Sequence, residues 1–168
     1  MPGGHHEKES GMRTMIAVLA AALFAVPMAS QAQSLSQHRI VMPGEVAWGP
    51  APPSLPPGAQ AATLYGDPTK PGVFALRLKL PKGYHIPPHT HPMPEIVTVI
   101  SGTFRIGMGP NPDHDKARAL PSGGFFGFDP GMTHYAYTDE ATVVQLNSIG
   151  PWVVNYVNPQ DDPRRKGK

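Results

Sequence analysis

Proline and glycine divide this chain into short segments that are too brief for stable helices. From residue 61 onward, apolar and β-branched stretches of four to eight residues alternate with turn-forming Gly, Pro, Asn and Asp. Such runs are typical of β-strands. With 22 prolines and 18 glycines in 168 residues, the chain is predicted to be an all-β barrel or sandwich. The expected strands cover residues 61–65, 73–80, 95–101, 103–108, 116–120, 125–128, 133–138, 142–148 and 152–157.

Alternation within two of these segments predicts which side chains face the core. In residues 73–80 the apolar side chains lie opposite Arg77 and Lys79, and in residues 103–108 they lie opposite Arg105. Because successive side chains of a strand point to opposite faces, each segment has one buried and one solvated face. The predicted inward set is Phe74, Leu76, Leu78, Leu80, Phe104, Ile106 and Met108.

The N-terminal region is predicted to be an export signal. Arg13 precedes the apolar run of residues 15–26, and small residues follow up to a cleavage site after Ala32. This run has the length of a signal-peptide core and is short for a membrane span, the alternative interpretation. We therefore expect a signal peptide over residues 1–32, with Met12 as an alternative start. The mature protein would be periplasmic or secreted, without a stable membrane anchor.

The remaining chain divides into three parts by composition. Residues 33–60 are rich in proline and predict an extended arm along the domain surface. Residues 61–157 hold the expected strands and form the barrel. Residues 158–168 are polar and interrupted by proline, so a flexible tail is expected there.

Charge and cysteine content exclude several classes of function. The formal net charge is only +2, and the basic residues are scattered rather than gathered into a stripe, which argues against nucleic acid as a partner. The chain has no cysteine, so disulfides and thiolate metal sites are ruled out. Any transition metal must be bound by histidine and carboxylate.

Three histidines and a glutamate form the candidate metal site. His89 and His91 are two residues apart and share a face if the segment is extended; Glu95 follows a bend made by two prolines. Glu95 would open an inward-facing strand beside valines, where a carboxylate is costly to bury unless it is paired with a cation. Downstream, His134 begins another expected strand. This donor set suits a divalent first-row metal with open coordination positions.

At this spacing the chain resembles the cupin superfamily. The first cupin motif, G(x)5HxH(x)3E(x)6G, is matched at every fixed position. In the second motif, Asp129 stands where proline is expected and Thr138 replaces asparagine, which leaves open the turn before His134. The matching positions are Gly83, His89, His91, Glu95 and Gly102 in the first motif, and Gly123, Gly131 and His134 in the second.

The resemblance implies a fold, a ligand set and a range of functions. The implied fold is a small double-stranded β-helix, or jelly-roll barrel, with His89, His91, Glu95 and His134 as metal ligands. Cupins with this ligand set include dioxygenases and oxidases, besides isomerases, decarboxylases and non-catalytic binding proteins. The expected function is a metal-dependent, dioxygenase-like oxidoreductase acting on a small chelating molecule. The alternatives are a non-catalytic small-molecule or metal-binding cupin and, more weakly supported, a metal-dependent isomerase or decarboxylase.

Other details of the site stay open at this level. Glu95 is also the candidate catalytic base. Mn, Fe, Cu, Zn and Ni all suit the donors, and a homodimer is compatible with the fold. His85 is interpreted as a rim residue or a hydrogen-bonding partner rather than a ligand. The strand at residues 142–148 has two possible orientations: in one, Gln145 and Asn147 face the barrel interior, and in the other, Val144 and Leu146 do so.

Overall fold

The computed structural model describes residues 1, 3–4 and 38–165. The predicted signal peptide, apart from Met1, Gly3 and Gly4, the alternative start at Met12, residues 33–37 of the arm and the last three residues of the tail lie outside the described residues. The chain divides into two units after residue 36, and the strands of the described residues belong to the second. Within the described ranges, no helix is long and apolar enough to cross a membrane.

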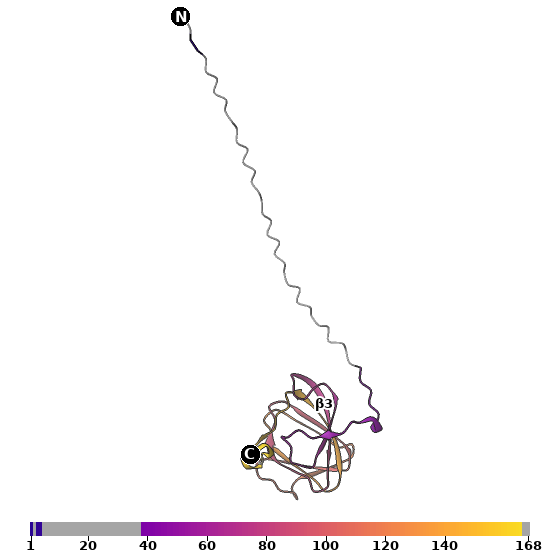
Figure 1. Cartoon of the computed structure of the whole chain (residues 1–168). Helices are drawn as coiled ribbons and strands as arrows, with labels where there is room; N and C mark the ends of the chain where they lie inside the picture. The colour runs from indigo at the N-terminus through magenta and orange to yellow at the C-terminus, as the bar shows by residue number, and fades with distance from the viewer. Residues whose placement is uncertain (2, 5–37, 166–168) are drawn as a thin grey trace. The chain divides into compact units, whose positions relative to one another are not determined.

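Two antiparallel sheets form the barrel and confirm the predicted all-β jelly-roll architecture (Figure 1). The first sheet has the order β1 (Gly49–Pro50), β2 (Gln60–Tyr65), β3 (Gly72–Leu80), β10 (Thr142–Gly150), β5 (Glu95–Ser101) and β8 (Phe125–Phe128). The second has the order β11 (Asn155–Tyr156), β4 (His85–Thr90), β9 (His134–Thr138), β6 (Thr103–Met108) and β7 (Arg118–Pro121). The described residues also form the 3-10 helices η1 (Pro43–Glu45), η2 (Pro159–Asp161) and η3 (Pro163–Arg165).

Three segments differ from the strand prediction, and the first is β1, a two-residue strand within the predicted arm. The last expected strand, residues 152–157, pairs only at Asn155–Tyr156, because Pro151 precedes it and residues 151–154 run outside the ladder. Conversely, β4 forms despite its two prolines. Its pairing with β9 shifts between Ile86 and His89, so Pro87 and Pro88 lie at an irregularity where the missing N–H groups break no regular ladder.

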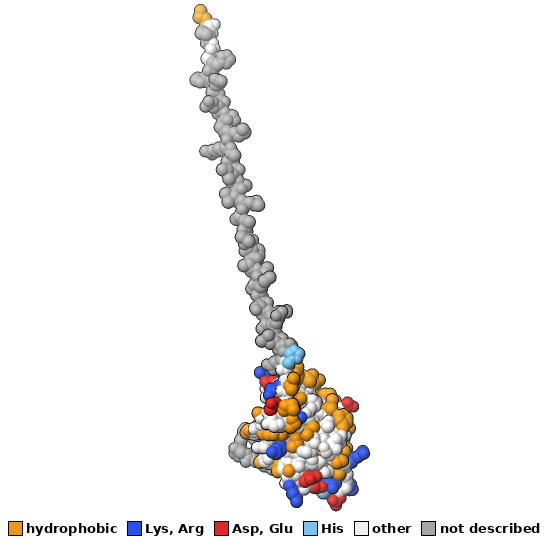
Figure 2. Space-filling model, turned by 90° about the vertical axis from the view of Figure 1, so that its right-hand side faces the viewer, with side chains coloured by type: hydrophobic (Ala, Val, Ile, Leu, Met, Phe, Trp, Pro, Cys, Tyr) orange, Lys and Arg blue, Asp and Glu red, His pale blue; other side chains and the backbone are white. Residues whose placement is uncertain are grey.

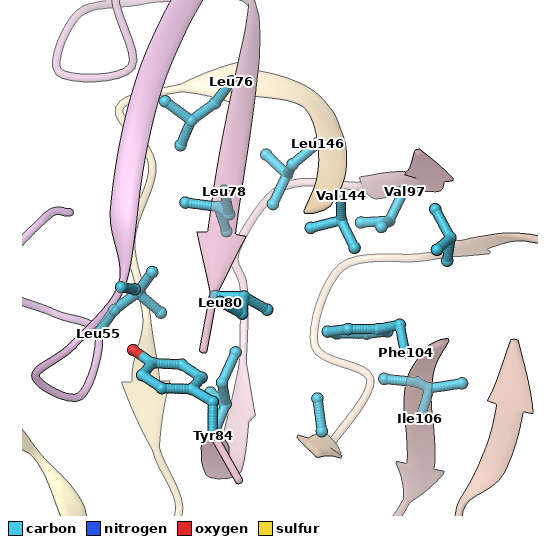
Figure 3. Packing of buried hydrophobic residues seen from close by; sticks show 14 of the residues in the cluster. Leu55, Leu76, Leu78, Leu80, Tyr84, Val97, Phe104, Ile106, Val144 and Leu146 are labelled. Atoms are coloured by element: carbon cyan, nitrogen blue, oxygen red, sulfur yellow. The ribbon is translucent and has the colours of Figure 1, made fainter. Parts of the chain in front are cut away.

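The core includes most of the side chains that the alternating sequence pattern predicted to face inward (Figure 3). The four side chains of β3 that were predicted to face inward, Phe74, Leu76, Leu78 and Leu80, are at most 3% exposed, and they meet β5, β6 and β10 inside the barrel. In β10, Val144 and Leu146 are each 2% exposed and face the barrel interior. Of the two orientations left open by the sequence, Gln145 and Asn147 therefore have the outward one. Gln145 accepts a hydrogen bond from Nε of Arg77 at 3.3 Å on that outer face.

Met108, predicted to face inward, is instead 48% exposed, because it ends β6 at the rim of the barrel.

The proline-rich arm contributes to the core as well as to the surface. Leu55 is only 5% exposed and lies in the hydrophobic cluster beside Tyr84 (Figure 3). The hydroxyl of Tyr84 donates to the carbonyl of Pro56, and that of Tyr156 donates to the carbonyl of Ser54 at 2.7 Å. The arm therefore closes part of the barrel, beyond the surface position expected from composition.

The described part of the tail, residues 158–165, is held against the barrel by an arginine. Arg164 donates to the carbonyl of Val154 at 2.9 Å and pairs with Asp162 at 2.7 Å. Val154 is two residues from Trp152, which packs against the candidate site described below.

The two glycines of the first motif differ in what surrounds them. Both have positive φ, +76° at Gly83 and +77° at Gly102. A Cβ at Gly102 would lie 2.6 Å from the carbonyl oxygen of Ala141, whereas a Cβ at Gly83 would meet nothing within 4 Å. Gly102 is thus required for both conformation and space, and Gly83 for conformation alone.

We expect Gly102→Ala to lower the free energy of unfolding by about 3 kcal/mol, through backbone strain plus the clash. The matched variant Gly83→Ala should cost about 1 kcal/mol, because it adds strain only. Urea unfolding of both variants measures the difference. Equal losses would show that the contact with Ala141 relaxes freely.

Candidate metal centre

Four side chains from different parts of the chain meet at one end of the barrel. His89 belongs to β4, His91 follows it, Glu95 opens β5 and His134 opens β9. His89 and His134 are directly paired across the β4–β9 ladder, which brings the two motifs together. All four are between 3% and 6% exposed. The structure thus gathers every ligand predicted from the sequence.

The turn between His91 and Glu95 is held from two sides. The carbonyl of His91 accepts a hydrogen bond from the backbone N–H of Gly131 at 2.8 Å. The hydroxyl of Ser148 donates to the carbonyl of Pro94 at 2.6 Å. The bend that the prolines introduce is therefore tied both to the loop before His134 and to β10.

The donor atoms converge on a common point. One ring nitrogen from each of His89, His91 and His134 lies within 4.8 Å of the others. Oε1 of Glu95 lies 3.4 Å from Nε2 of His91, and Oε2 lies 3.1 Å from Nε2 of His134.

Backbone carbonyls determine the tautomer of all three imidazoles. Nδ1 of His89 lies 2.7 Å from the carbonyl of Pro87, Nδ1 of His91 lies 2.7 Å from that of Val153, and Nδ1 of His134 lies 3.0 Å from that of Met132. A carbonyl oxygen can only accept, so each Nδ1 carries a proton and donates it. In the neutral rings every Nε2 therefore presents a lone pair, the arrangement that metal-binding histidines adopt.

Burial and neighbouring charges set the protonation states. Burial, with smaller contributions from His134 and His91, lowers the pKa of His89 to about 3. Burial also lowers the pKa of His91. Burial acts to raise the pKa of Glu95, but the approach of His134 to within 3.1 Å and the positive charge that the three histidines carry when they are protonated bring this pKa below its usual value. At neutral pH the site therefore combines neutral imidazoles at His89 and His91 with an ionised carboxylate at Glu95.

These residues fit a bound metal ion. Nε2 of His91 is buried without a hydrogen-bond partner, although a carboxylate oxygen is 3.4 Å away. Lone pairs that face each other and a carboxylate repel unless a cation lies between them, and the low pKa values of His89 and His91 disfavour a proton there. Three nitrogens and one carboxylate would satisfy a divalent transition metal.

An internal cavity of about 30 Å³ adjoins the donors. His89, Glu95 and His134 line it, and so does Trp152. The remaining wall is apolar and belongs to the barrel core: Leu55, Leu78, Leu80, Ile86, Val97, Phe104, Ile106, Phe126, Ala136, Val144 and Leu146. The donor set therefore faces a small space with a mostly apolar wall rather than a polar cleft.

The departure from the second motif at Thr138 has a structural role. Thr138 is 2% exposed, donates to the carbonyl of Pro81 at 2.6 Å and accepts from the backbone N–H of Tyr84 at 3.1 Å. It thereby fastens β9 to the turn before β4. The loop of residues 129–131 still delivers His134, so the variant motif leaves the ligand geometry intact.

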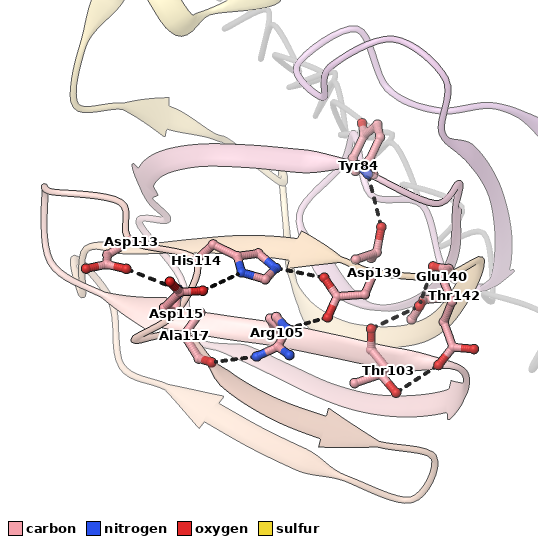
Figure 4. Close-up of polar contacts among 11 residues, drawn as sticks. Tyr84, Thr103, Arg105, Asp113, His114, Asp115, Ala117, Asp139, Glu140 and Thr142 are labelled. Atoms are coloured by element: carbon pink, nitrogen blue, oxygen red, sulfur yellow. Dashed lines mark hydrogen bonds and ion pairs between the residues drawn. The ribbon is translucent and has the colours of Figure 1, made fainter.

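The other histidines lie outside the donor cluster. His85 stacks on Tyr137 at 4.4 Å between ring centroids, and His38 is exposed. Figure 4 shows His114 between two carboxylates: its Nε2 lies 2.7 Å from Asp139 and its Nδ1 3.2 Å from Asp115. Hydrogen bonds to Asp139 and Asp115 raise the pKa of His114, and Arg105 pairs with Asp139 from the other side. This exposed network joins a loop to the β9–β10 turn.

Trp152 is the residue near the donors that sequence reasoning missed. Its ring stacks on His91 with centroids 5.5 Å apart and planes 14° apart. Its segment has the pattern of an ordinary strand, and neither the composition nor the position of that segment links it to the first cupin motif, residues 83–102.

Comparisons with known proteins agree with this fold. A protein-family model described as a cupin domain matches residues 76–149. A search of the curated proteins found no match. The polyketide cyclase RemF from Streptomyces resistomycificus has a similar structure, with a TM-score of 0.63, 15% identity and coverage of 76% of this chain and 90% of that one.

Two further solved structures are similar. An acetylacetone dioxygenase-like protein from Methylibium petroleiphilum PM1 has a TM-score of 0.57 and 18% identity, covering 76% of this chain and 85% of that one. An RmlC-like cupin from Shewanella frigidimarina NCIMB 400 has a TM-score of 0.52 and 15% identity, covering 68% and 91%. At these identities the likeness concerns the fold.

Proposed function

Because this chain belongs to the cupin superfamily and its clustered donors open onto an apolar cavity, we propose that it is a metal-dependent, dioxygenase-like oxidoreductase. Its substrate would be a small organic molecule with oxygen atoms that chelate the metal, and dioxygen would be the oxidant. The predicted signal peptide supports a periplasmic or extracellular location.

The composition of the cavity wall carries this proposal. Among the residues that line the cavity, His89, Glu95 and His134 are the only titratable ones. An isomerase or a decarboxylase would need an acid–base pair in addition to the metal ligands. Oxidation by dioxygen needs no such pair, because a redox-active metal, when bound, supplies Lewis acidity and electron transfer.

Each residue of the site has a role in this proposal. His89, His91 and His134 would bind the ion through Nε2, with their Nδ1–H groups held by backbone carbonyls. Glu95 would complete the ligand set and lower the net charge of the site. As the only carboxylate in the cavity wall, it is also the group to which a substrate proton would pass. The apolar wall would exclude water from the reaction.

The fold also occurs in a protein described as acetylacetone dioxygenase-like, which supports chemistry of this class on such a barrel.

The cavity's size favours a second candidate, a metal-binding cupin without catalytic activity. About 30 Å³ is small beside the roughly 300–1,000 Å³ of typical small-molecule sites. On this alternative the barrel would hold the ion and admit no organic substrate.

Oxygen uptake by reconstituted protein distinguishes the two functions. The protein would be loaded with Mn, Fe or Cu and offered catechols, flavonols, β-diketones and small dicarboxylates. We expect one of these substrates to be consumed together with dioxygen, at a rate that His114→Ala preserves and His134→Ala abolishes. Retention of metal with no oxygen uptake on any substrate would favour the non-catalytic alternative.

A further inference from the structure

The position of Trp152 is held from several sides. It follows β10, and its backbone N–H donates to the carbonyl of Pro68 at 2.7 Å. Its neighbour Val153 accepts the hydrogen bond from Nδ1 of His91, and Val154 is fully buried. The indole stacks on His91 and forms part of the cavity wall beside the metal donors. The ring is thus placed by the same short segment that orients a ligand.

The indole nitrogen has a proton and no acceptor. Among the described residues, Nε1 of Trp152 is one of three buried side-chain atoms without a hydrogen-bond partner. An indole N–H can only donate, and leaving it unpaired when buried costs about 1–3 kcal/mol. Such groups in native proteins call for a ligand, an ion or a water.

A second unpartnered atom belongs to the same region. Nε2 of His91, the ring on which Trp152 stacks, has a lone pair and needs a cation. Nε2 of His91 therefore lacks a cation to accept its lone pair, and Nε1–H of Trp152 lacks a hydrogen-bond acceptor. A metal ion with an oxygen ligand supplies both at once: the metal to His91 and the ligand oxygen to the indole N–H.

We propose that the cavity binds a small oxygen-donor ligand, such as a carboxylate, hydroxamate or enolate, and that Trp152 Nε1–H donates a hydrogen bond to its oxygen. This inference deepens the proposed function and rests on the metal site. The cavity is only about 30 Å³, so ligands of a few non-hydrogen atoms suit it better than larger ones. Trp152 would thus select oxygen ligands over nitrogen ligands of similar size.

The indole proton reports this contact directly. In protein loaded with zinc, which is diamagnetic, the two tryptophans give two indole N–H resonances, and Trp48→Phe assigns them. Adding acetohydroxamate, a small bidentate oxygen ligand, should move the Trp152 resonance downfield. Imidazole has the same number of non-hydrogen atoms but presents an N–H on its outer side, and it should give no downfield shift. Equal responses to both ligands would overturn the proposal.

A substitution measures the contribution of the hydrogen bond. With Co²⁺ in place of zinc, visible absorption follows binding of acetohydroxamate and of imidazole to the metal. Trp152→Phe should weaken acetohydroxamate binding about tenfold, the worth of one hydrogen bond. Imidazole affinity and metal affinity should stay within about twofold. Trp48→Phe serves as the matched control.

The outcomes separate this inference from the function on which it rests. If the wild-type protein retains no metal, the metal site itself is wrong. If metal and acetohydroxamate bind but Trp152→Phe binds both as tightly as the wild type, the indole N–H serves only an internal water and the inference fails. If Trp152→Phe loses metal affinity instead, Trp152 positions His91 and is not the donor.

Discussion

Replacing His134 with alanine should reduce metal affinity at least about 100-fold. Mutation of a group that merely orients a metal ligand costs about 10–100-fold, and removal of a ligand should cost more. The Nε2 atom of His134 lies 3.1 Å from Oε2 of Glu95, so its loss also leaves that carboxylate without its nearest partner. Elemental analysis and competition with a chromogenic chelator measure the change.

His114→Ala is the matched control for this prediction. His114 is also a histidine paired with carboxylates, but it is exposed and belongs to the network of Asp139 and Arg105 (Figure 4). Its removal should leave metal content unchanged. Circular dichroism establishes that His134→Ala is folded, and His134→Gln provides a second variant with a longer side chain. Full occupancy in a folded His134→Ala protein would mean that the site assignment is wrong.

Metal should also stabilise the fold through this site. A ligand that binds only the folded state at about 100 times its dissociation constant contributes about 2.7 kcal/mol. The wild type and His114→Ala should gain this stability, whereas His134→Ala should not.

Phe74→Ala should lower the free energy of unfolding by about 3–5 kcal/mol. Phe74 is completely buried on the inner face of β3, so truncation removes its transfer free energy and leaves a cavity among close-packed neighbours. Since small domains are stable by only about 5–15 kcal/mol, the variant should unfold at much lower denaturant concentration. Urea unfolding monitored by tryptophan fluorescence measures the loss.

The adjacent residue provides the control. Val73 lies on the opposite face of the same strand and is 63% exposed. Val73→Ala should change the free energy by less than about 0.5 kcal/mol. A loss below about 1.5 kcal/mol in Phe74→Ala would mean that the core collapses around the missing ring.

The surface of the barrel agrees with the charge pattern in the sequence. On the face displayed in Figure 2, Lys and Arg side chains are interspersed with Asp and Glu and with apolar side chains. The outer face of the first sheet also exposes apolar side chains, among them Ile96, Ile100 and Phe125. Glu95, Val97 and Val99 on the inner face of β5 are buried, whereas Ile96 and Ile100 on its outer face are exposed.

Sequence patterns predicted what depends on neighbours along the chain. The alternation in β3 and β6 follows from the geometry of a single strand, so it could be assigned without a partner, and Met108 deviates only because it lies at the rim. The prediction of a strand at residues 152–157 is wrong over its first half. Strand pairing needs a partner strand, and the β-propensity of a segment does not show whether one lies beside it.

The sequence by itself determined the donors: the spacing of His89, His91 and Glu95 is local, and the register of His134 follows from the second motif. Only the tertiary structure determined how these donor side chains are oriented and which residues enclose them. The carbonyl that orients His91 comes from Val153, 62 residues away. Leu55, Trp152 and the inward-facing side chains of β10 complete the cavity wall, and they belong to segments outside both motifs. Such contacts depend on burial and pairing between distant strands, and short-range sequence patterns carry no record of them.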